Sequence, residues 1–91
     1  MKYTKAIGIR LDELLKKENL TQTQFAQKSK ISRMTINSII KGRVKLVTFE
    51  ILLIIFDTLN ITVKEFFTSD IFQLKFEETE KNKGRKIQQK G

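Results

Sequence analysis

The sequence predicts an all-α fold, a compact bundle of about five helices. Apolar residues recur at the three- and four-residue spacing of amphipathic helices, and a Thr or Ser with N-cap chemistry precedes four of the five expected segments. The length of 91 residues allows one small domain. We expect this domain over residues 1–76 with its core in residues 7–67. Residues 77–91 hold one apolar residue in fifteen, which predicts a flexible charged tail.

The first expected helix ends near Asn19. One of its sides is charged, and the other carries apolar residues at the i, i+4, i+7 and i+8 positions. These apolar residues are Ile7, Leu11, Leu14 and Leu15. The pattern is that of an amphipathic helix with one face in the core.

A helix-turn-helix is expected next. Thr21 and Gln24 have the spacing of a capping box, so a second helix starts at Gln22. Ser32 supplies the start signal of a third helix, which ends at Gly42, a residue type that tolerates the left-handed conformation. The pairs with hydrophobic-staple spacing are Leu20 with Phe25 and Ile31 with Ile36. Because only about three residues separate the two helices, they meet through a tight turn.

Two further helices follow a basic loop. Thr48 caps a fourth helix over residues 49–59, and Thr62 caps a short fifth helix over residues 63–67 that can extend to Phe72. Eight of the eleven residues of the fourth helix are apolar. Its expected core face is Phe49, Leu52, Ile55, Phe56 and Leu59.

The fourth helix is also apolar outside this core face, because 100° per residue places Ile54 roughly 160° from Leu52. A small monomer does not have enough protein to cover such a helix, so we expect a two-fold homodimer. The expected dimer or partner surface is Ile51, Leu53, Ile54 and Phe72. The alternative is coverage by the chain's own C-terminal segment, through Ile71, Phe72, Leu74 and Phe76.

The charge distribution indicates a polyanionic partner. The net charge is +8, from 18 Lys and Arg against 10 Asp and Glu. Residues 20–49 contain six basic residues and no acidic one, which suits a phosphate backbone. The six are Lys28, Lys30, Arg33, Lys41, Arg43 and Lys45. On charge alone, the solvated surface of a Lys-rich protein is the alternative.

The composition argues against catalysis and metal binding. The chain has no Cys and no His, so it lacks a thiol nucleophile, the commonest general base and the usual zinc ligands. The adjacent acidic residues 12–13 and 77–78 have no such partner, and we expect them on solvated surface. We therefore expect no enzyme, no cofactor and no metal ion.

Apolar stretches in the sequence are short. No run of signal-peptide length follows Met1, and the longest apolar run is the six residues 51–56. We therefore expect a soluble cytoplasmic protein. Binding of a basic amphipathic helix to an anionic membrane is a further alternative, against which the tight turn argues, because it rules out one long interfacial helix.

These residues resemble the Cro/C1-type helix-turn-helix family, the xenobiotic-response-element-like regulators of phages and bacteria. The similarity extends from Leu11 to Phe67 and lies in the order and spacing of its parts. These parts are Leu20-Thr21-Gln22, Phe25-Ala26, Ile31-Ser32-Arg33, Thr35-Ile36, Ile39, Gly42, Thr48-Phe49-Glu50, Leu52, Ile55, Leu59-Asn60-Ile61 and Phe66-Phe67. Three positions depart from the family pattern: Ser29 where Gly is frequent in the turn, Ile40 where many members carry Glu, and Val47 where Pro is common. The resemblance implies a lambda-repressor-like bundle.

The resemblance also implies that the third helix enters the major groove of double-stranded DNA while the second crosses the backbone. The expected base-facing residues are Ser32, Arg33, Met34, Asn37 and Ser38. The expected phosphate-binding residues are Thr21, Gln22, Thr23, Thr35, Lys41, Arg43 and Lys45. Arg33 would pair with guanine, Asn37 with adenine and Met34 with a thymine methyl group. Partial burial beside the second helix is the alternative for Met34.

The leading hypothesis is a sequence-specific transcriptional regulator of bacterial or phage origin that binds a palindromic operator as a homodimer. We expect a repressor, because 91 residues leave no room for a sensor domain. The second hypothesis is an antitoxin or adaptor of the same fold. It would bind a partner protein through the apolar surface of the fourth helix and the C-terminal segment.

Overall fold

The structure, a computed structural model, describes residues 2–72, which form five helices and no strand. The helices are α1 (Tyr3–Lys17), α2 (Gln22–Ser29), α3 (Arg33–Ile40), α4 (Phe49–Leu59) and α5 (Val63–Phe67). A further helical turn occupies residues 70–72. The expected all-α fold is thus confirmed for this part of the chain. The expected tail over residues 77–91 and the domain end at residue 76 lie outside the described residues.

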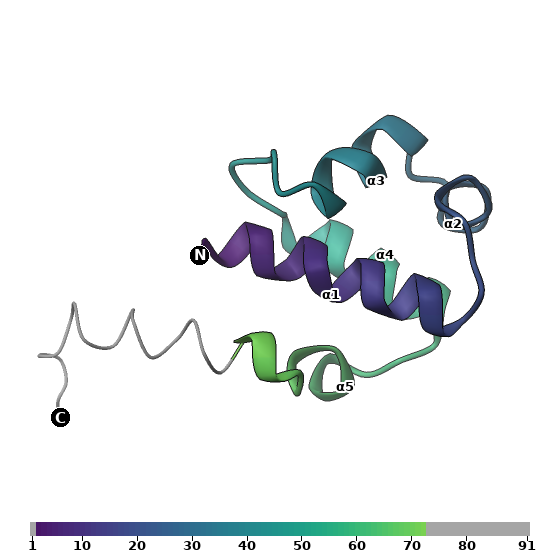
Figure 1. Cartoon of the computed structure of the whole chain (residues 1–91). Coiled ribbons are helices and arrows are strands. Elements are labelled where there is room, and N and C mark those ends of the chain that lie inside the picture. The colour runs from purple at the N-terminus through teal and green to yellow at the C-terminus, as the bar shows by residue number, and fades with distance from the viewer. Residues whose placement is uncertain (1, 73–91) are drawn as a thin grey trace, which may run out of the picture.

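The longest helix, α1, runs through the centre of the bundle. Figure 1 shows α3 on one side of α1 and α5 on the opposite side, with α4 behind α1 and α2 seen end on. The buried side chains of all five helices meet in one core. Its largest fully buried members are Phe25, Phe66, Phe72, Ile7, Leu11, Leu15, Ile36 and Ile55.

The expected N-caps of α2, α4 and α5 are confirmed. Thr21 and Gln24 form the capping box of α2, with the Thr21 hydroxyl accepting from the Gln24 N–H at 3.0 Å and Gln24 Oε1 accepting from the Thr21 N–H at 2.9 Å. Thr62 and Glu65 form a second capping box at α5. Thr48 caps α4 through its hydroxyl. These side chains satisfy backbone donors that have no partner inside the helix, and so they set where each helix begins.

The backbones of α1 and α3 approach each other closely at Gly8. A Cβ atom at Gly8 would lie 2.8 Å from the Ile40 carbonyl oxygen and closer still to that of Ile39. Only Gly leaves room for this contact. Ile40 itself is half-buried and packs against the core. The apolar residue that replaces the family's frequent Glu therefore helps to position α3.

Arg10 joins α1 to α5 on the other side of the bundle. Its Nε donates to the Phe66 carbonyl oxygen at 2.8 Å and its Nη2 to the Glu65 carbonyl oxygen at 2.7 Å. Carbonyl groups in the last turn of a helix lack intrahelical donors, so Arg10 caps the C-terminus of α5. The side chain is 18% exposed and also lies 3.3 Å from Glu13. The sequence pattern, which places Arg10 on the charged side of α1, does not predict this role.

The core face of α4 is shorter than expected. Leu52, Ile55 and Phe56 are buried, and Leu59 is half-buried. Phe49 is 66% exposed, although it points within about 20° of Phe56 around the helix axis. The prediction that Phe49 belongs to the core is therefore wrong. Phe49 is the first residue of α4, so its side chain lies at the very end of the helix.

Phe72 lies in the core rather than on a surface. Its side chain is 1% exposed. Its ring centroid is 4.9 Å from that of Phe67 and 5.9 Å from that of Phe66, because the turn over residues 70–72 packs against α5. Phe72 therefore does not belong to the expected dimer or partner surface.

Candidate nucleic-acid interface

Three consecutive residues build the turn between α2 and α3. Ser29 is buried, and its hydroxyl accepts a hydrogen bond from the Ile31 N–H at 3.1 Å. Lys30 has the left-handed backbone conformation, with φ 67°. Ile31 is buried and holds the turn against the core. Lys30, and not Ser29, is thus the residue of this turn with a positive φ.

Ser32 begins α3. Its Oγ accepts a hydrogen bond from the Thr35 N–H at 3.1 Å and donates one to Thr35 Oγ1 at 2.9 Å. The expected N-cap is therefore confirmed, and the Ser32 hydroxyl hydrogen is engaged within the helix. Thr35 accepts that bond, which leaves its own hydroxyl hydrogen available to an acceptor outside the protein.

The N-terminal half of α3 presents unpaired side chains to solvent. Arg33 is exposed, and within residues 2–72 its guanidinium makes no hydrogen bond and no ion pair. Met34 is 80% exposed, so the alternative of partial burial beside α2 is wrong. Arg33, Met34 and Asn37 line a shallow hollow on this surface. Ser38, the last expected base-facing residue, is half-buried.

A hydrogen bond between side chains connects α2 to α3. Asn37 Nδ2 donates to Gln22 Oε1 at 3.1 Å, and both residues are half-buried. The bond uses one of the two hydrogens of the Asn37 amide, and no residue within 2–72 donates to its Oδ1. Asn37 thus keeps one donor and one acceptor, the pair that an adenine edge requires.

The expected phosphate-binding residues lie at both ends of the helix-turn-helix. Thr21, Gln22 and Thr23 stand at the N-terminus of α2, where the Thr21 hydroxyl serves as the cap of the helix. The N–H groups of residues 22 and 23 have no acceptor inside the helix, so they can bind an anion. The second group is exposed at the end of α3 and in the loop that follows: Lys41, Arg43 and Lys45.

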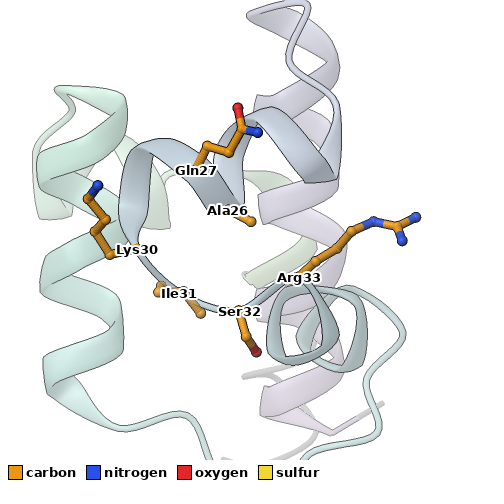
Figure 2. Close-up of a pocket in the computed structure, with 6 residues that line it drawn as sticks. All are labelled: Ala26, Gln27, Lys30, Ile31, Ser32 and Arg33. Atoms are coloured by element: carbon orange, nitrogen blue, oxygen red, sulfur yellow. The ribbon is translucent and has the colours of Figure 1, made fainter.

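A second shallow hollow lies at the turn itself. It is lined by Ala26, Gln27, Lys30, Ile31, Ser32 and Arg33. Figure 2 shows Lys30 and Arg33 on opposite sides of the turn, with their charged ends pointing away from each other. Lys30 is absent from the residues that the sequence predicts for DNA binding. Lys30 lies in the acid-free stretch, residues 20–49, which contains no acidic residue. Neither helical periodicity nor the family motif distinguishes it from the other lysines there.

An exposed helix that follows a tight turn and presents unpaired hydrogen-bonding side chains, within a stretch of sequence that has no acidic residue, is typical of a helix-turn-helix DNA-binding domain. Residues 10–70 match the family model of the Cro/C1-type HTH DNA-binding domain, and the chain belongs to this family. The match spans more than half of the 91 residues. No curated protein and no solved structure matches the chain. Among residues 2–72, no helix has the length and apolarity needed to cross a membrane.

Proposed function

We propose that the protein is a transcriptional regulator that binds a specific sequence of double-stranded DNA and acts as a repressor. The observation that carries the proposal is the exposed N-terminal half of α3, where Arg33 and Met34 have no partner within residues 2–72. One face of this helix thus exposes both an apolar side chain and a guanidinium. Such a combination is typical of a surface that binds a ligand. Repression requires only that bound protein excludes polymerase from an overlapping site.

Three residues of α3 would read bases in the major groove. Arg33 would donate both hydrogen bonds of its fork to guanine O6 and N7, and Met34 would contact a thymine methyl group. Asn37 would donate to adenine N7 and accept from N6, using the groups that its bond to Gln22 leaves free. The remaining base-facing candidates are Ser32 and Ser38.

The phosphate contacts would fix the position of α3 without selecting a sequence. The N–H groups at the start of α2, with Thr21, Gln22 and Thr23, would bind one phosphate, and the Thr35 hydroxyl would donate to another. Lys41, Arg43 and Lys45 would approach the neighbouring backbone. Their charges lie in the acid-free stretch, so no carboxylate of that stretch opposes them.

Selection of binding sites from random duplexes tests the proposal. A specific regulator yields one consensus. On that site, Arg33→Ala relaxes the preference at one base position at a cost of about 1–3 kcal/mol, because one bidentate contact is lost. Arg43→Ala is the matched control: it weakens binding to all sequences alike and lowers the salt dependence. Recovery of duplexes with no shared sequence would contradict the proposal.

We further propose that two copies bind a palindromic operator with half-sites about 34 Å apart. The exposed apolar residues of α4 support this, with Leu53 45% and Ile54 38% exposed. Ile51, which the sequence also predicts on this surface, is half-buried and packs partly against the core. Burial of Leu53 and Ile54 between two copies would remove apolar area from water at about 25 cal/mol per Å².

Sedimentation equilibrium at micromolar concentration tests the homodimer. The wild type is expected to dimerise, and Leu53→Glu/Ile54→Glu to be monomeric with an unchanged helical circular dichroism spectrum. Lys17→Glu on α1 is the control, since it alters charge without touching α4. A monomeric wild type would contradict the homodimer and leave the DNA-binding proposal standing.

A second candidate function is that of an antitoxin or adaptor with the same fold. The exposed side chains of Leu46 and Phe49 favour it, since they extend the apolar surface beyond the two α4 residues assigned to the dimer. A stable complex with the product of a neighbouring reading frame supports this candidate, provided that Phe49→Glu abolishes the complex and leaves operator binding intact.

A further inference from the structure

Four residues of the described chain have a left-handed backbone: Asn19 (φ 58°), Lys30 (φ 67°), Gly42 (φ 69°) and Asn60 (φ 56°). Gly and Asn accept this conformation at little cost, whereas most other side chains do so at a cost in free energy. Lys30, at the C-terminus of α2, is thus the exception among the four. The conformation itself ends α2, as a left-handed residue commonly does at a helix C-terminus, so it is the choice of a lysine there that calls for a reason.

Among the residues that the structure describes, no contact accounts for a lysine at this position. Lys30 is exposed, and within residues 2–72 its ammonium makes no hydrogen bond and no ion pair. A positive charge at the C-terminus of a helix does stabilise the helix, because it interacts favourably with the helix dipole. However, Lys28 already supplies that charge in the last turn of α2, in ordinary helical backbone. The dipole therefore does not require a charged residue in the strained conformation.

The place of Lys30 in the fold suggests what its charge does. It lies three residues before Arg33, the first residue of α3, and both residues line the hollow at the turn. Figure 2 shows the two charged ends on opposite sides of that turn. With Arg33 directed into the major groove, an ammonium on the far side of the turn would face the phosphate backbone that borders the groove.

We propose that Lys30 is a phosphate contact of the DNA complex and that the left-handed strain at the end of α2 is retained to hold a positive charge there. The proposal rests on the proposed function and adds a residue to its phosphate-binding set. A phosphate contact positions the protein and carries no sequence information. Loss of this charge therefore weakens binding to every duplex by the same factor.

Three variants at this position separate charge from strain. Lys30→Gln removes the charge and keeps a side chain in the left-handed conformation. Lys30→Gly removes both the charge and the strain, and Lys30→Arg keeps both. Lys28→Gln is the matched control, because it removes an exposed charge two residues earlier in regular helix. Affinity is measured by fluorescence anisotropy on the selected site and on a random-sequence duplex between 50 and 200 mM salt, and Tm by circular dichroism.

We expect Lys30→Gln and Lys30→Gly to lose affinity equally on both duplexes, with the slope of log K against log salt reduced by about 0.9. Lys30→Gly alone is expected to raise Tm, by about 4 °C, because only it relieves the backbone. Lys30→Arg binds as the wild type does, and Lys28→Gln changes affinity less than Lys30→Gln.

Two results would overturn the inference. If Lys30→Gln keeps the affinity and salt slope of the wild type, the Lys30 ammonium does not contact DNA. If Lys28→Gln and Lys30→Gln have equal effects, the position carries no particular contact. A wild type that binds duplexes without any sequence preference contradicts the proposed regulator but leaves this test intact, because the random-sequence duplex still reports the contact.

Discussion

The Asn37 side-chain amide donates a hydrogen bond to Gln22 Oε1 over 3.1 Å and so connects the first residue of α2 to the middle of α3. The bond fixes the rotation of the Asn37 amide. Its Oδ1 and its second N–H are then held in one orientation, in which they would meet a base under the proposed function. We therefore propose that Gln22 acts on base recognition through Asn37, in addition to the phosphate contact proposed for it.

Gln22→Leu is expected to reduce the preference for adenine opposite Asn37, because Asn37 can then rotate freely. The loss should be a part of the 1–3 kcal/mol that a bidentate base contact contributes. Relative affinities for the four bases at that position measure it. In a double-mutant cycle, Gln22→Leu and Asn37→Ala should be non-additive by at least about 0.5 kcal/mol. Thr23→Ala, a phosphate-side control, should leave the base preference unchanged, and strict additivity of the pair would refute the coupling.

Gly8→Ala is expected to destabilise the fold strongly. Its Cβ would meet the Ile39 and Ile40 carbonyl oxygens, which belong to backbone that cannot move aside as a side chain can. Overpacking of this kind costs about 1–3 kcal/mol or more. Urea unfolding measures the loss, with exposed Lys17→Ala on the same helix as the control, expected within about 0.5 kcal/mol of the wild type. A Gly8→Ala variant as stable as the wild type would show that α1 and α3 can separate freely.

Arg10→Lys is expected to lower stability even though it keeps the charge. Lysine lacks the planar fork that reaches the Glu65 and Phe66 carbonyl oxygens together. The expected loss is about 1–3 kcal/mol, since the donor is charged and the Phe66 bond is partly buried. Thermal unfolding measures it, with Arg43→Lys in the exposed loop as the control. Equal Tm values for the Arg10→Lys and Arg43→Lys variants would show that the α5 cap contributes nothing.

Ser32→Ala is expected to cost about 1 kcal/mol, because the Thr35 N–H loses its acceptor. Ser32→Gly should cost only a few tenths of a kcal/mol, since Gly is itself an acceptable N-cap. Chemical denaturation distinguishes the two variants. If both lose the same stability, the hydroxyl of Ser32 is not the cap of α3.

The helices and their caps could be predicted because the responsible signals are local in sequence. Thr21 with Gln24, and Ser32 ahead of α3, lie within one turn of the backbone groups that they satisfy. The expected helix-turn-helix and the end of α3 before Gly42 follow from the same short-range chemistry. For the same reason, the exposed position of Arg33 on α3 could be predicted from the sequence.

Contacts between distant segments could not be predicted in this way. The bond of Arg10 to Phe66 joins residues far apart in sequence, and the charged pattern of α1 gives no sign of it. The helical periodicity predicts Phe49 in the core, and the structure shows it exposed. A periodic pattern gives the direction of a side chain around the helix axis but not its position along the axis. The sequence offers two places for Phe72, the dimer surface or a C-terminal segment that folds back on the bundle. Only the tertiary packing of Phe72 against α5 decides between them. The left-handed Lys30 likewise shows no local sequence signal.

The placement of α5 on the opposite side of α1 from α3 has a practical consequence for experiments on this protein (Figure 1). The chain contains no cysteine, so a Lys64→Cys substitution on the exposed surface of α5 would introduce a unique thiol. A fluorophore attached there would be separated by the bundle from α3, the helix proposed to enter the major groove. Such a label offers a way to count protein copies on single DNA molecules while the binding surface stays unmodified.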